Sequence, residues 1–176
     1  MKRSEIHAAL GEAPSAFAGA GWVLPPGPRW DVTDFGWGEF PRVGRVLVNL
    51  SEEPESCEKL RFAREKEVTS MPGHGEKKED IICRHGRCAP ELWADHPGKC
   101  AEKTLFSLSR NGSLFGVRSG AVIPLNAGER ITLVPAGVSR ILAGGRRRWH
   151  RRGLDGKRRS EWQLFCRSTR HARNRD

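Results

Sequence analysis

The clearest candidates for chemistry in this sequence are a histidine and a glutamate, His74 and Glu79, which are separated by four residues in a segment rich in charge. A neutral imidazole and a carboxylate are ligand types that hold a divalent cation while leaving positions open for substrate oxygens. One histidine and one glutamate at this spacing are also typical of a solvated, charged loop. The spacing alone therefore leaves both interpretations open.

The segments that would have to position these two residues favour β-structure. Short apolar–polar alternations are separated by turn dipeptides such as Asn111-Gly112 and Ser119-Gly120. Several short strands at this spacing indicate an all-β sandwich or barrel. The segments expected to be strands are 45–50, 60–64, 117, 121–123 and 130–134.

Before these strands the pattern changes. Residues 3–10 predict a short N-terminal helix, capped by Ser4, with Ile6, Ala9 and Leu10 on one apolar stripe. Residues 11–29 are rich in glycine, alanine and proline and predict no regular structure.

Length and composition limit the class of protein. A chain of 176 residues suits one globular domain. No apolar run has the length of a membrane helix or the form of a signal peptide, so a cytoplasmic protein is expected. Its five cysteines are odd in number and irregularly spaced, which favours free thiols over a disulfide framework.

Charge is distributed very unevenly along the chain. Twelve basic and three acidic residues fall in 145–176, so this segment carries +9 of the net charge of +10 and residues 1–144 carry +1. Such an arginine-rich tail is expected to be disordered and to bind nucleic acid without sequence specificity. A shifted reading frame in GC-rich DNA would produce the same composition.

Several segments together resemble the D-lyxose isomerase family, over roughly residues 1–138. The two most distinctive are Trp30–Gly36, with the letters WDVTDFG, and Thr69–Ile82, which contains both His74 and Glu79. The weaker matches are 1–6, 24–26, 57–59, Arg84, Gly86, 91–92 and 126–133. The resemblance implies an all-β cupin-type barrel (a double-stranded β-helix, or jelly roll) over residues 1–144, followed by the basic tail.

The same resemblance implies a metal site with two of its four ligands. His74 takes the place of the second histidine of an H-x-H pair, and Glu79 the place of the carboxylate ligand. Pro72 replaces the first histidine and has no donor atom, and Arg140 replaces the last histidine. A permanently protonated guanidinium cannot bind a cation.

Two lysines match residues that line the sugar site of the family. Lys59 and Lys77 are therefore the candidate catalytic residues, because a lysine cation can polarise a carbonyl or an enediolate oxygen. Without the resemblance, each would be an ordinary surface lysine.

The family chemistry is the isomerisation of D-lyxose to D-xylulose, with related pairs such as mannose and fructose. A divalent metal, manganese in the family, would chelate the sugar C1 and C2 oxygens while a base moves a proton through a cis-enediol. The resemblance also suggests a homodimer. For this chain, with two ligands replaced, we expect weak metal binding and little turnover.

Two departures from the family fit a damaged gene. The C-terminal motif that contains the family's acid/base glutamate is absent, although residues 144–176 can be back-translated so that a one-base shift restores it. About thirty family residues between Pro28 and Trp30 are also missing.

Two other classes of function use residues outside this resemblance. Cys83, His85, Cys88 and Cys100 are zinc-ligand types, but without paired Cys-x₂-Cys spacing they are better explained as incidental thiols. The basic tail, with Trp149 and Trp162 available for stacking, could bind nucleic acid, but it contains no motif of a known domain.

Overall fold

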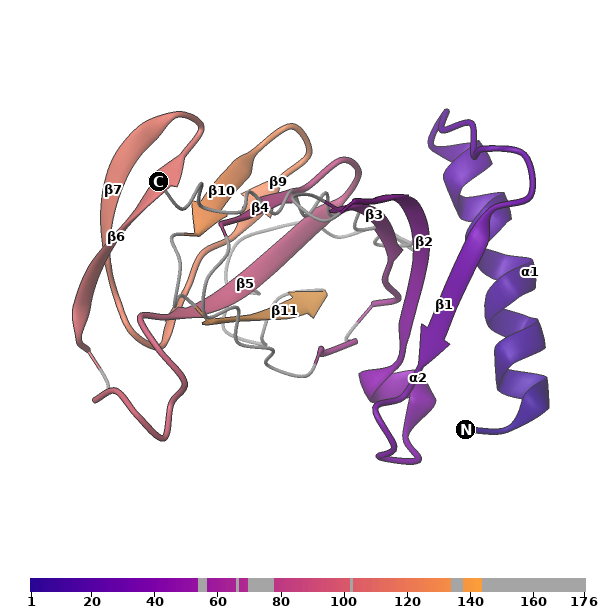
Figure 1. Ribbon diagram of the computed structural model, residues 1–176, viewed down its shortest axis with the longest axis horizontal. Helices are drawn as coiled ribbons and strands as arrows, with labels where there is room; N and C mark the ends of the chain where they lie inside the picture. The colour runs from indigo at the N-terminus through magenta and orange to yellow at the C-terminus, as the bar shows by residue number, and fades with distance from the viewer. Residues whose placement is uncertain (54–56, 66, 70–77, 102, 134–137, 144–176) are drawn as a thin grey trace, which may run out of the picture.

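The computed structural model describes residues 1–53, 57–65, 67–69, 78–101, 103–133 and 138–143, and within these residues the chain is mostly β-structure (Figure 1). This confirms the all-β expectation. The helices are α1 (Arg3–Gly19) and α2 (Phe40–Val43). The strands are β1 (Arg29–Thr33), β2 (Arg45–Glu52), β3 (Cys57–Phe62), β4 (Glu79–Ile82), β5 (Arg87–Trp93), β6 (Leu105–Arg110), β7 (Ser113–Arg118), β8 (Ala121–Val122), β9 (Leu125–Asn126), β10 (Arg130–Leu133) and β11 (Val138–Ala143).

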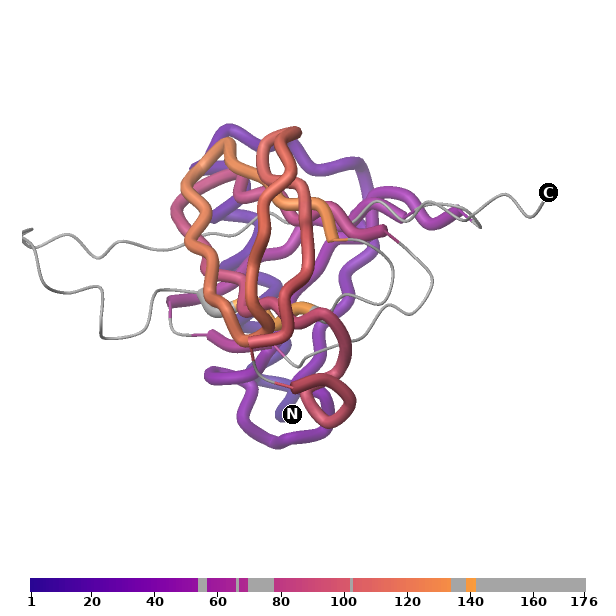
Figure 2. Tube along the Cα trace, turned by 90° about the vertical axis from the view of Figure 1, so that its left-hand side faces the viewer, coloured from indigo at the N-terminus to yellow at the C-terminus, as the bar shows by residue number. Residues whose placement is uncertain are grey.

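The described strands pair in three antiparallel groups. Their orders are β1-β2-β3, β4-β10-β6-β7 and β11-β5-β8, and β9 also pairs with β5. The β1-β2-β3 sheet lies between α1 and the other strands (Figure 1). The β6–β7 hairpin lies at the opposite end, facing the viewer in Figure 2. This is a cupin-type barrel, as the resemblance implied.

The N-terminal helix is longer than expected, because α1 continues through residue 19 and contains Pro14. Proline at this position costs one backbone hydrogen bond. Its cost is offset by burial, since Ala9, Ala13 and Phe17 are fully buried in one apolar cluster. Tertiary packing thus extends the helix into a segment whose composition argued against it.

Alternation along β3 separates two environments. Leu60 and Phe62 belong to the apolar cluster that includes the buried face of α1. Lys59 and Arg61 alternate with them and therefore lie on the opposite face of the sheet. Ala63 follows two residues after Arg61, on the same face as Lys59 and Arg61, and it belongs to the barrel core. The polar face of this sheet is therefore directed toward the barrel interior.

The barrel core joins the other two sheets. Ile81 of β4, Leu108 of β6 and Ile131 of β10 pack in one cluster with Leu92 of β5 and Ile141 of β11. Each of the first four is at most 1% exposed. This core fixes which faces of β4, β5 and β11 point inward, and so decides where any functional side chain on these strands can lie.

The alternating runs and turns predicted from the sequence agree with β2, β3, β7, β8 and β10. Asn111 and Gly112 both have positive φ, 50° and 86°, as the turn of the β6–β7 hairpin requires. The sequence did not predict β1, β4, β5, β6, β9 or β11. In β5 every residue after Arg87 is buried, so the strand has no polar face to reveal it.

Candidate functional site

Glu79 is the first residue of β4 and pairs with Leu133 of β10. It lies two residues before Ile81, so its side chain lies on the same face of β4, the face that carries the barrel core. The Glu79 side-chain oxygen Oε2 is buried. The other site residues expected near it, Pro72, His74 and Lys77, lie outside the described residues.

Arg140 lies directly opposite Glu91 where β11 pairs with β5. The Arg140 Nη2 atom is 2.6 Å from Glu91 Oε2, and the indole N–H of Trp93 donates to Glu91 Oε1 at 3.1 Å. Arg140 and Glu91 alternate with the core residues Ile141 and Leu92, so they lie on the other face of these strands. The guanidinium at position 140 is therefore already paired with a buried carboxylate.

This arrangement decides how well the described residues fit a divalent metal. Glu79 lies on the core face of β4, whereas Arg140 lies on the face of β11 that points away from the core. The family's last metal ligand is thus replaced by a cation that is directed elsewhere. Across the described ranges no group of three or more histidine, cysteine, aspartate or glutamate side chains could hold a metal ion. Of the expected metal ligands, the described residues therefore supply Glu79 alone.

Lys59 projects from the interior face of the β1-β2-β3 sheet and is 21% exposed. Its Nζ atom is 3.3 Å from Glu52 Oε1, and its cross-strand neighbour is Asn49. Asn49 Oδ1 is buried without a hydrogen-bond partner among the described residues. The structure thus places Lys59 beside a polar group that faces the barrel interior.

A buried ion pair holds the segment that leads toward His74. Arg61 Nη2 is 2.6 Å from Glu67 Oε1, and both side chains are at most 4% exposed. Burial raises the pKa of Glu67, although the arginine and the backbone N–H of Arg64 oppose this change. Two residues later, Thr69 donates its N–H to the carbonyl of Ile141 at 3.0 Å and accepts the N–H of Ile141 at 2.9 Å. The segment that contains His74 therefore begins beside β11.

The WDVTDFG segment forms a turn and two ion pairs. Asp31 is 3.0 Å from Arg45, and the Asp34 carboxylate accepts the Gly36 N–H at 3.0 Å. Asp34 also lies 3.1 Å from the amino group of Met1. Hydrogen bonds from that amino group and from Gly36 lower the pKa of Asp34. These aspartates are therefore structural, as turn and capping bonds at a strand end predict.

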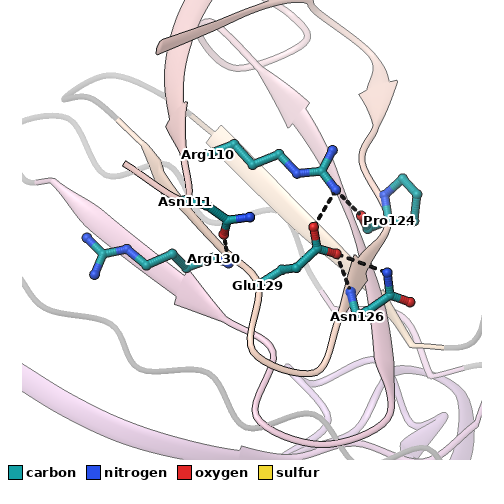
Figure 3. A network of polar contacts seen from close by, with 6 residues as sticks. All are labelled: Arg110, Asn111, Pro124, Asn126, Glu129 and Arg130. Atoms are coloured by element: carbon teal, nitrogen blue, oxygen red, sulfur yellow. Dashed lines mark hydrogen bonds and ion pairs between the residues drawn. The ribbon is translucent and has the colours of Figure 1, made fainter. Parts of the chain in front are cut away.

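A second polar network holds the turn before β10, the partner strand of β4 (Figure 3). Arg110 Nη2 is 2.8 Å from Glu129 Oε1, while Glu129 Oε2 accepts the backbone N–H of Asn126 at 2.8 Å and its side-chain amide at 3.0 Å. The Asn126 N–H, followed by Arg110, lowers the pKa of Glu129. Beside it, Asn111 Oδ1 accepts the Arg130 N–H. The network positions β10 and contains no reactive group.

The zinc-module hypothesis is not supported by the positions of its three cysteines. Cys83 and Cys88 lie in the barrel core, and Cys100 donates to the carbonyl of Asp95 at 3.3 Å. The cysteines at positions 57, 83, 88 and 100 are free, as predicted. The basic tail at 145–176 lies outside the described residues, and so does the nucleic-acid hypothesis that rests on it.

The site residue that the sequence did not reveal is Glu91. It matched the family only as part of a Glu-Leu pair, and its position as the partner of Arg140 depends on strand register. One signal was present, since a single carboxylate stands within a run of otherwise apolar residues at 88–93. A charge in such a run needs a partner. Of the helices that the structure describes, none has the length and apolar character to cross a membrane.

The chain is similar in sequence to curated proteins. The D-lyxose/D-mannose isomerase of Serratia proteamaculans is 37% identical over 117 residues, which are 61% of this chain and 51% of that protein. The D-lyxose/D-mannose isomerase of Escherichia coli O157:H7 is 30% identical over 168 residues, with 77% and 74% covered. The chain thus spans about half the length of the first relative and three-quarters of the second.

Solved structures show the same fold at low identity. L-ribose isomerase of Cellulomonas parahominis superposes with a TM-score of 0.64 at 14% identity, covering 98% of this chain and 84% of that one. L-ribose isomerase of Acinetobacter sp. DL28 also gives 0.64, at 10% identity, covering 98% and 82%. The family model described as D-lyxose isomerase matches residues 27–145. This chain belongs to the D-lyxose isomerase family.

Proposed function

We propose that this chain is a D-lyxose isomerase-like protein whose family reaction is the aldose–ketose isomerisation of D-lyxose to D-xylulose, with D-mannose to D-fructose as a related pair. The proposal is supported by the family match and by two relatives named D-lyxose/D-mannose isomerase. A monosaccharide is the substrate class that follows. The preferred metal, Mn²⁺, a homodimeric assembly and a cytoplasmic location belong to the same proposal.

We further propose that this polypeptide has little activity of its own. The observation that supports this low activity is the ion pair between Arg140 and Glu91, because it places a cation at the last ligand position of the family. His74 and Glu79 would be left to hold Mn²⁺, with Lys59 and Lys77 beside the sugar. Two protein ligands are fewer than the three that catalytic metal sites commonly use. Loss of the family's acid/base glutamate would lower turnover by roughly 10²–10⁴-fold more.

The test is turnover of D-lyxose and D-mannose by the full chain, with Mn²⁺ added or removed, measured by ketose formation beside the Escherichia coli O157:H7 relative. We expect ketose formation reduced by at least the roughly 10²-fold that a lost acid/base group costs. A Lys59→Met variant should reduce whatever remains. Turnover equal to that of the relative would overturn the inactivity. If the chain neither converts nor binds D-lyxose and D-mannose, it would be a non-catalytic member of the family.

A further inference from the structure

Two buried cysteines flank the connection between β4 and β5. Cys83 follows the last residue of β4, and Cys88 is the second residue of β5. Their exposed fractions are 0% and 2%, and both belong to the barrel core. The four residues between them bend the chain, with Gly86 at a φ of 68°, while Cys83 exchanges backbone hydrogen bonds with Gly128 and Glu129 and Cys88 pairs with Leu125. One buried thiol therefore lies just after the end of β4 and the other near the start of β5.

The two cysteines are in contact. The Cys83 sulfur has hydrogen bonds with the side chain and with the backbone N–H of Cys88. Its thiol also donates to the carbonyls of His85 and Gly86, at 3.5 Å and 3.6 Å. The Cys83 sulfur thus lies against the carbonyls of the connection and beside the second cysteine.

The cover over these sulfurs is thin and positively charged. Of the residues in the connection, Arg84, His85 and Arg87 are exposed, and Gly86 is partly exposed. The Arg84 guanidinium lies 5.6 Å from the centre of the Trp22 ring, which keeps it at this surface. Two permanent cations beside a thiol attract an anionic reagent.

The environment favours the reactive form of Cys83. Hydrogen bonds from Cys88 and its backbone N–H lower the pKa of the Cys83 thiol, although burial and the nearby Glu129 oppose this change. The thiolate is the nucleophile in disulfide exchange. A thiol of this kind with a second cysteine beside it is the arrangement that forms a reversible disulfide.

We propose that Cys83 and Cys88 are a redox modification site that closes into an intramolecular disulfide by exchange with a small anionic disulfide such as glutathione disulfide. The Cys83 thiolate attacks one sulfur of the reagent, forms a mixed disulfide and releases one thiol. The Cys88 thiolate then attacks the Cys83 sulfur and releases the second thiol. Two protein thiols are oxidised, their two protons go to the released thiols or to solvent, and the reagent is reduced by two electrons.

The test uses the full-length chain, equilibrated with mixtures of oxidised and reduced glutathione, then alkylated and mapped by mass spectrometry. We expect a crosslinked peptide that joins residues 83 and 88, lighter by two hydrogen atoms and reversed by dithiothreitol. In Cys88→Ser the exchange should stop at a mixed disulfide on Cys83. In Cys83→Ser, Cys88 should remain reduced under the same conditions. Cys100, which is partly exposed, shows in each sample that retains it whether the reagent has reacted at all.

Two outcomes would overturn the proposal. The first is that Cys83 and Cys88 stay reduced, and are therefore alkylated, in mixtures that fully oxidise Cys100. The second is that Cys83 pairs with a cysteine other than Cys88. Circular dichroism of each variant shows whether it has folded. Where a single variant fails to fold, the measurement is repeated in a background in which the other three cysteines are replaced, Cys57→Ser, Cys100→Ser and Cys166→Ser. This background leaves Cys83 and Cys88 as its two thiols. None of these readouts depends on isomerase activity.

Discussion

Arg140 of β11 and Glu91 of β5 face each other across neighbouring strands, with Nη2 and Oε2 only 2.6 Å apart on the side of β5–β11 that points away from the barrel core. The Glu91 carboxylate is 8% exposed and also accepts the indole N–H of Trp93. A buried carboxylate needs a compensating cation or hydrogen-bond donor. In this chain the residue at the last ligand position of the family supplies that cation.

The first prediction is that removal of the guanidinium destabilises the fold more than removal of both charges. Arg140→Met removes the guanidinium that pairs with the buried Glu91 carboxylate and should lower the free energy of unfolding by about 1–3 kcal/mol, since solvent partly screens a side chain that is 32% exposed. The double variant Arg140→Met, Glu91→Gln should recover part of this loss. Urea denaturation of both single variants and the double variant measures the coupling. Equal stability of wild type and Arg140→Met would contradict it.

The second prediction concerns the metal. Because Arg140 and Glu79 lie on strand faces with different surroundings, Arg140→His alone should not tighten Mn²⁺ binding. The binding is measured by titrating the chain with Mn²⁺ and following the paramagnetic resonance signal of the free ion. Glu79→Gln is the matched control, because it removes the one expected ligand that the structure describes. Tighter binding in Arg140→His that is lost again when Glu79 is also replaced would show that position 140 does reach the site.

The third prediction is a pH dependence of stability that depends on Glu129. The folded pKa of this glutamate lies below its ordinary value of 4.5, because Asn126 and Arg110 stabilise the carboxylate. A lowered folded pKa stabilises the fold at pH values above the ordinary pKa. This contribution is lost as the pH falls from about 4.5 through the folded pKa. Glu129→Gln should therefore lower the stability at neutral pH by about 1 kcal/mol and match wild type in stronger acid.

Urea denaturation over a series of pH values measures the Glu129 effect. Glu65→Gln, at an exposed carboxylate after β3, controls for the general change in net charge. A difference between Glu129→Gln and wild type that stays constant from neutral pH into strong acid would mean that shape rather than charge is responsible.

The sequence predicted the alternating strands better than the buried ones, for a physical reason. In β3, Leu60 and Phe62 pack against one cluster while Lys59 and Arg61 stay polar, so alternation is visible in the letters. In β5, both faces are buried and the pattern disappears. The extent of α1 could not be predicted either, because its continuation past Pro14 depends on burial against β2 and β3.

In the candidate site, too, some features could be predicted from the sequence and others depend on strand pairing. Lys59 and Glu79 could be selected from the sequence because they match family positions, and the inability of Arg140 to bind a metal follows from its chemistry alone. The direction in which Arg140 points could not be predicted. It is fixed by the register that places Arg140 opposite Glu91 rather than opposite Leu92, and register is a property of two strands together.

The fourth prediction tests the close packing of α2 against the start of β2. An ideal Cβ atom at Gly44 would lie 2.8 Å from ring carbons of Phe40 and nearer still to its carbonyl oxygen. Phe40 is itself 2% exposed and cannot move outward without opening the apolar cluster beneath α1. Gly44→Ala should therefore lower the free energy of unfolding by about 1–3 kcal/mol.

The matched control for this fourth prediction is Gly116→Ala. Gly116 lies within β7, has no heavy atom within 4 Å of an added Cβ, and its φ is outside the positive region. Alanine there restricts the unfolded chain without a clash, so its effect should be neutral or slightly stabilising. Thermal and urea denaturation of both variants give the comparison. If Gly44→Ala were as stable as Gly116→Ala, then Phe40 would have room to move, and the packing of α2 against the sheet would be looser than its contacts indicate.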